Sequence, residues 1–267
     1  MPENFSTLVY LFAAYLGFFA IEHIAPHFKK RKQHLQHSLR NLFLASINYF
    51  AALAIFILLL SHVFQWTHEN NFGLLNQFNL DQMDVILVTI VLIDLWQYFW
   101  HRINHTVIFL WRFHQVHHAD KDMDASTGVR FHTIEIIFSS MTRLVVIPVL
   151  GIQIDHLLIY ELIAILVILF HHSNIKLNEN LDRLLRVVIV TPHMHRLHHS
   201  DIKSETNSNY ASIFSFWDRL FKSYTMRPIE KDFRLGLGQQ FSLVEWNSLK
   251  GMLKIPFQKL PPYTQPQ

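Results

Sequence analysis

The chain has 267 residues, of which 51% are hydrophobic and only 16% are charged, with a small net charge of +3. Soluble domains usually carry about a quarter charged residues, so this composition predicts a membrane protein. The absence of cysteine excludes disulfides, cysteine-ligated zinc and cysteine-ligated iron–sulfur clusters. Histidine, with 19 residues, is the outlier of the composition.

Five apolar segments predict the membrane helices. Residues 7–21 form the first; they lack a basic start and a small-residue cleavage site, which favours a membrane helix over a signal peptide. Residues 42–64 are long enough to span a hydrocarbon core of about 30 Å, and residues 83–100 form a third helix. Residues 134–151 and 154–170, joined by the tight link GIQID, predict a hairpin that spans the membrane or re-enters it.

The loops between the first three segments differ in charge. Loop 24–41 contains no acid and five basic residues, Lys29, Lys30, Arg31, Lys32 and Arg40. Loop 65–82 contains acids but no lysine or arginine. The positive-inside rule therefore places loop 24–41 in the cytoplasm, where the third helix returns the chain at His101. With aliphatic segments on both sides, the basic cluster favours lipid headgroups over nucleic acid as its partner.

The hairpin then brings residues 101–132 and 171–200 to the same face of the membrane. We predict an all-α polytopic membrane protein with about four to five membrane helices, three plus the hairpin, and a cytoplasmic histidine-rich helical cap. In the cap, the leucine spacing of residues 177–190 predicts an amphipathic helix on the membrane surface. Thr191 and Pro192 end that helix and begin the next.

Three histidine clusters lie on this face. His101 and His105 form the first; His114, His117 and His118 form the second; His195, His198 and His199 repeat the second cluster's H-x-x-H-H spacing. Residues three and four apart share a helix face, so each cluster directs its imidazoles to one place. Imidazole suits iron, zinc, copper and nickel, and eight imidazoles fit two adjacent metal ions. We expect no catalytic residue separate from these ligands.

Ser242 and Glu245 have the spacing of a capping box before a short helix that ends near Pro256, and the last residues, PPYTQPQ, have the composition of a frayed tail.

The three histidine boxes after several membrane helices resemble the fatty acid hydroxylase/sterol desaturase superfamily. The similarity extends to the motifs RFHTIE (130–135), HSN (172–174), TPHMHRLHH (191–199) and SFWDRLF (215–221). It implies a catalytic domain over residues 85–225, preceded by membrane helices and a basic cytoplasmic loop in residues 1–84 and followed by a cytoplasmic tail in 226–267.

The resemblance implies a membrane-embedded non-haem di-iron oxygenase that hydroxylates or desaturates a C–H bond of a lipid. O2 would be the co-substrate, and the lipid a sterol, a fatty acyl chain or an ether lipid. It adds His132 and His172 to the eight expected iron ligands, although Thr133 stands where the family usually has proline. No flavin, dinucleotide or haem motif is present, so the electrons would come from a separate donor protein.

Two other functions remain open from the residues alone. A zinc-dependent membrane hydrolase needs fewer histidines and a nucleophile that the pattern does not offer. A histidine-rich metal transporter or sensor would favour histidines distributed along the helices rather than at their ends. His171 and His193 have ligand-like neighbours but fall outside the matched pattern.

Charged residues near or within the apolar segments need partners. Asp94 lies about two turns before His101 on the same face, so it is a candidate to accept a hydrogen bond from a ligand imidazole, Trp96 or Tyr98. Arg143 and Glu161, on the two arms of the hairpin, are expected to form a structural pair. Three aspartates after the second box are interpreted as solvated charges or as partners of ligands: Asp120, Asp122 and Asp124.

Overall fold

The structure, a computed structural model, describes residues 2–29, 33–230, 232–238 and 247–258. This part of the chain folds into α-helices and short 3-10 turns, with isolated β-bridges but no β-strand. The all-α fold expected from the sequence is confirmed.

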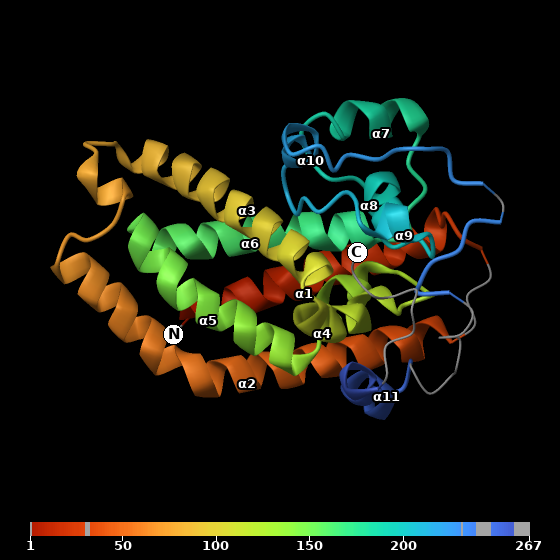
Figure 1. Ribbon diagram of the computed structural model, residues 1–267, viewed down its shortest axis with the longest axis horizontal. Coiled ribbons are helices and arrows are strands. Elements are labelled where there is room, and N and C mark those ends of the chain that lie inside the picture. The colour runs from red at the N-terminus through yellow and green to blue at the C-terminus, as the bar shows by residue number, and fades with distance from the viewer. Residues whose placement is uncertain (1, 30–32, 231, 239–246, 259–267) are drawn as a thin grey trace.

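Five long helices form the body of the molecule, and Figure 1 shows them running along its long axis. They are α1 (Pro2–Ile24), α2 (His34–Glu69), α3 (Gln82–Thr106), α5 (Thr133–Leu150) and α6 (Ile154–His172). Helices α2, α3, α5 and α6 are long and apolar enough to cross a membrane, whereas the apolar stretch of α1, Phe12–Ile24, is shorter. Four of the five membrane helices that the sequence predicts are therefore present as apolar helices of spanning length among the described residues.

The second helix is longer than expected, which corrects the predicted loop 24–41. Helix α2 begins at His34 and has 36 residues, a length of about 54 Å that exceeds the hydrocarbon core. Its first turns bury His37 and Asn41 against the segment after α4. Of the predicted basic cluster, residues 30–32 lie outside the described part of the chain.

At one end of the bundle, two glycines bring the connection between α2 and α3 against the turn between α5 and α6. Gly151 ends α5 with φ of 76°, a left-handed conformation that glycine adopts without strain, and the chain reverses there into α6. Gly73, after α2, packs so closely that a Cβ atom would come within 2.3 Å of the Gly151 backbone. The Leu74 N–H also donates to the Val149 carbonyl at 3.0 Å. The α2–α3 connection is therefore fastened to the turn of the hairpin.

The opposite end carries a cap of short helices (Figure 1). These are α4 (Ile108–His118), α7 (Glu179–Leu185), α8 (Pro192–His198), α9 (Lys203–Thr206), α10 (Phe216–Leu220) and α11 (Leu249–Lys254), with the 3-10 turns Ala125–Val129 and Ile255–Phe257. The histidine boxes lie at this end of the molecule.

One local prediction in the cap needs correction. The amphipathic helix expected over residues 177–190 ends at Leu185, because the β-branched residues that follow turn to pair with another segment: the Val190 N–H donates to the Ile213 carbonyl at 2.9 Å. The next helix begins as expected, with Thr191 as its N-cap. The capping box at Ser242 and Glu245 and the terminal tail lie outside the described residues, whereas Ser248 caps α11.

Candidate metal centre

Four helices deliver nine histidines, the eight of the boxes and His172, to one place. His101 and His105 lie on the last turns of α3, the second box lies on α4, and the third lies on α8 and its C-cap, His199. His172, the last residue of α6, joins them. All nine side chains are buried.

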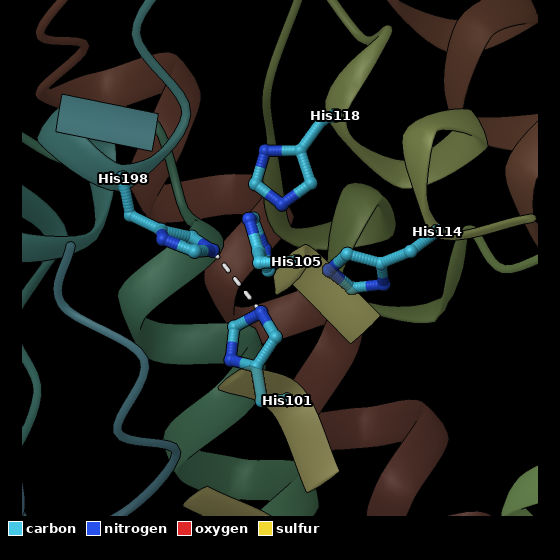
Figure 2. A group of neighbouring side chains, drawn as sticks. All are labelled: His101, His105, His114, His118 and His198. Atoms are coloured by element: carbon cyan, nitrogen blue, oxygen red, sulfur yellow. Dashed lines mark hydrogen bonds between the residues drawn. The ribbon is translucent and has the colours of Figure 1, made fainter. Parts of the chain in front are cut away.

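The nine imidazoles divide into two groups, and within each group one nitrogen per ring lies within 4.8 Å of every other. The five-histidine group contains His101, His105, His114, His118 and His198, whose rings converge in Figure 2. The four-histidine group contains His117, His172, His195 and His199. Nitrogens bound to one ion at about 2.0–2.1 Å lie at most roughly 4.2 Å apart, so small movements would close each group on an ion.

Several ring nitrogens are buried without a hydrogen-bond partner among the described residues. They include Nε2 of His105 and His114, Nδ1 of His117 and His195, and both nitrogens of His118 and His199. An unsatisfied buried polar atom usually costs about 1–3 kcal/mol, so such a concentration indicates ligands for a cation. An all-imidazole set suits iron, zinc, copper or nickel and is poor for magnesium or calcium.

Other residues orient the rings through their Nδ1 atoms. The acceptors are the Tyr210 carbonyl for His101 (2.7 Å), the Ser208 carbonyl for His198 (2.6 Å), the Ile168 carbonyl for His172 (2.8 Å) and the Glu135 carboxylate for His114 (2.7 Å). A carbonyl or carboxylate oxygen can only accept, so these rings carry a proton on Nδ1 and present the Nε2 lone pair to a metal. Sequence reasoning missed Glu135, although it ends the RFHTIE motif.

Burial keeps five of the candidate ligands in the cap neutral by lowering their pKa. It lowers the pKa of His198 to about 3, with the neighbouring His114 and His172 acting in the same direction. Burial and the crowding of imidazoles likewise lower the pKa of His117, His118, His195 and His199 well below the ordinary value. Metal binding requires the neutral ring, so the site is prepared for it at physiological pH.

Three candidate histidines lie outside both groups. His132, predicted as a ligand, instead caps α5: its Nδ1 accepts the Ile134 N–H at 3.1 Å. This position leaves His132 outside both groups, and Thr133 begins the helix. His171 stacks on His195 with ring centroids 4.0 Å apart, and His193 lies within hydrogen-bonding distance of the Arg227 carbonyl, at 2.9 Å.

Asp94 makes hydrogen bonds to the cap rather than to a histidine. Its buried carboxylate accepts the backbone N–H groups of Ile213 and Phe214, both at 3.0 Å, and the Trp217 indole N–H at 2.9 Å. Asp218, in the same SFWDRLF motif, accepts the N–H of Tyr210, whose carbonyl orients His101. The motif therefore fastens the segment that positions a candidate ligand.

The aspartates after the second box are only partly as predicted. Asp122 is exposed, but Asp120 and Asp124 are buried, and His37 lies 2.9 Å from each of their carboxylates. Burial alone would raise the pKa of Asp120, but His37 and Arg130 beside it hold that pKa below its usual range. Asp120 and Asp124 are therefore structural anchors that attach the segment after His118 to α2.

A cavity of about 180 Å³ lies beside the histidines, between α3, α5 and α6. Five of the candidate ligands line it: His101, His114, His117, His172 and His195. Its apolar walls include Phe131, Ile136, Ala164 and Ile168, and it extends to Arg143 and Glu161. These last two form the predicted ion pair, with Nη1 and Oε1 2.5 Å apart. The cavity thus connects both histidine groups with the membrane helices.

Comparisons with known proteins identify a family and several relatives of this chain. The model of a protein family described as fatty acid hydroxylase matches residues 86–223. The ornithine lipid hydroxylase OlsE of Rhizobium tropici is 26% identical over 152 residues, which cover 57% of this chain and 45% of that protein. The alkylglycerol monooxygenase of Homo sapiens is 29% identical over 137 residues, which cover 49% and 28%. The Xenopus tropicalis alkylglycerol monooxygenase is 30% identical over 169 residues, which cover 61% and 35%.

The matched region spans less than half the length of each of these relatives. No solved structure matches the chain.

Proposed function

Because the chain belongs to the fatty acid hydroxylase family, we propose that it is a membrane-bound oxygenase that uses O2 and external electrons to hydroxylate a C–H bond of a lipid. One observation carries this proposal: two groups of buried imidazoles border a single, mainly apolar cavity between membrane helices. Hydroxylation is preferred to desaturation because the relatives are named a hydroxylase and monooxygenases.

In this proposal the five-histidine and four-histidine groups each hold one iron ion, and the bound irons supply the activation of O2. The carbonyls of Tyr210 and Ser208 and the carboxylate of Glu135 fix the ligand rings, so little reorganisation accompanies metal binding. Because the ligands are buried, bulk water would be kept away from the bound metal ions.

The proposed substrate is a lipid that enters the cavity with an alkyl chain along Phe131, Ile136 and Ile168. The relatives' names point to ornithine lipids and alkylglycerols, both of which carry a polar group on an apolar chain. An apolar wall fits a methylene chain because it gains dispersion contacts and loses no hydrogen bond.

The remaining parts of the proposal concern organisation. Residues 85–225 form the catalytic domain, residues 1–84 supply the first two membrane helices, and residues 226–267 form a tail. The cap faces the cytoplasm, because the basic residues of segment 24–41 favour the cytoplasmic side under the positive-inside rule. There a separate protein delivers the electrons. The gathering of the histidines at one end of the helices supports an oxygenase over a transporter, whose ligands would follow a path across the membrane.

Lipid profiling under ¹⁸O2 tests the function. Cells that express the chain should gain a lipid carrying one ¹⁸O atom, and the purified protein should bind about two iron ions, one for each histidine group. His117→Ala should abolish the labelled product, whereas His193→Ala, a cap histidine outside both groups, should retain it. Zinc alone after anaerobic reconstitution with iron, or unlabelled lipids from the wild type, would overturn the proposal.

A further inference from the structure

An ion pair on two apolar helices lines the same cavity as the histidines. Arg143 lies on α5 and Glu161 on α6, and both helices are candidate membrane spans. Arg143 is eight residues beyond Glu135, which contacts His114, so the pair lies about 12 Å along the helix from the candidate metal centre. The cavity reaches both places.

The two side chains of the pair are only partly buried. The side chains of Arg143 and Glu161 keep 28% and 39% of their surface exposed, and Arg143 Nε has no hydrogen-bond partner among the described residues. Ionisable groups within membrane helices are costly unless they face a cavity or each other, and such groups usually serve a function.

The surroundings hold the guanidinium in place. The Trp96 ring lies 5.4 Å from the Arg143 guanidinium carbon, in a cation–π contact. Ser139, one turn earlier on α5, and Gln97 on α3 also line the cavity. With the ion pair, they give the cavity polar groups besides the histidines.

We propose that Arg143 and Glu161 form the subsite that binds the polar group of the lipid substrate. The arginine donates and the carboxylate accepts, so the subsite suits a group that does both and has no net charge: a hydroxyl, or an ammonium with a carboxylate. A singly charged group would leave one charge uncompensated in a medium of low dielectric constant. By holding the polar group, the subsite also determines which carbon of the lipid, roughly 12 Å from that group, lies beside the histidines. The inference depends on the proposed function only in naming the ligand a substrate.

Lipid binding by the full chain in detergent micelles, measured by native mass spectrometry without O2 or reductant, tests the subsite. The probes share one acyl chain: a monoacylglycerol, its di-O-methyl ether, a zwitterionic O-acylserine and an anionic acylglycerol phosphate. The wild type should bind the monoacylglycerol or the O-acylserine about tenfold more tightly than the ether and the phosphate, from one or two added hydrogen bonds to charged groups. The stronger of the two identifies the hydroxyl or the zwitterion as the natural chemistry.

Two double variants separate binding from folding. Arg143→Met with Glu161→Met should bind all four probes within about twofold of one another. Arg143→Glu with Glu161→Arg keeps an ion pair between the helices, so it should retain the preference that the wild type shows. Equal binding of the four probes by the wild type, or an unchanged preference in the methionine variant, would overturn the subsite. Because no turnover is measured, a failure of the proposed oxygenation would leave this result standing.

Discussion

Glu135 offers a direct test of how the candidate metal centre is assembled. Its carboxylate accepts a hydrogen bond from His114 Nδ1 at 2.7 Å, and both side chains are buried. It lies in the first turn of α5, where the helix dipole favours a negative charge. Glu135→Gln keeps the shape and one acceptor but removes the charge that makes the His114 ring a stronger ligand.

Loss of such a partner typically weakens metal binding 10- to 100-fold, or about 1.4–2.8 kcal/mol. The effect should be confined to the five-histidine group, since Glu135 is bonded to none of the histidines of the other group in the structure. Anaerobic titration with ferrous iron against a competing chelator should therefore change from two tight sites to one tight and one weak site. Metal analysis after desalting should fall from about two ions per chain toward one.

His132→Ala is the matched control, because His132 caps the same helix three residues earlier. It should cost about 1 kcal/mol of unfolding free energy, as the loss of an N-cap does, and leave both metal ions bound. Two tight sites in Glu135→Gln would refute the role of the carboxylate. Loss of an ion from His132→Ala would return His132 to the ligand set.

Three further changes test the frame around the site. Asp94→Ala leaves two backbone N–H groups and the Trp217 indole without their acceptor, so thermal unfolding should show a loss on the order of 3 kcal/mol or more; an unchanged melting temperature would contradict this. Ala164→Phe fills the cavity, so lipid turnover should fall at least tenfold while metal content stays constant, and full turnover would place the substrate elsewhere. Burial and the nearby Arg196 lower the pKa of His27 to about 4. The unfolded chain therefore binds a proton at His27 more readily than the folded chain, and the free energy of unfolding decreases as the pH falls from 6.5 toward 4. In His27→Gln, unfolding measured across that range should depend less on pH, by on the order of 1 kcal/mol, and an equal slope would exclude His27 as a source.

The membrane helices could be predicted because hydropathy and length are local properties of the chain. The end of α7 could not, since the residues after Leu185 are drawn away by pairing with residues near 213. The start of α2 could not be predicted from the sequence for a related reason. His37 and Asn41 look like loop residues in the sequence, but they are helical and buried against Asp120 and Ser126, more than 80 residues away.

The box histidines could also be predicted, because each box has helical spacing and the topology brings the boxes to one end. The partners of the ligands could not. The contacts of His114 with Glu135 and of His101 with the Tyr210 carbonyl cross 21 and 109 residues, and no spacing rule reports them. His172 was found only through the family resemblance, since it belongs to no box; the same resemblance suggested His132, which the structure places at a helix cap.

The division of the two H-x-x-H-H boxes explains why that spacing is needed. In each box the first and last histidines, four residues apart, lie about 40° apart around the helix and enter one group, whereas the middle one, about 100° from its neighbour, enters the other. Thus His114 and His118 join His198, and His195 and His199 join His117. The exchange makes each metal group depend on both α4 and α8, so neither group can form unless the two helices are docked.

The three remaining candidate ligands complete the two groups unequally. His101 and His105 complete the five-histidine group, whereas His172 alone completes the other. Three of the four histidines in the smaller group line the cavity, against two of five in the larger. The group with fewer protein ligands is also the one more open to the cavity, as expected of the metal that must leave positions free beside a substrate.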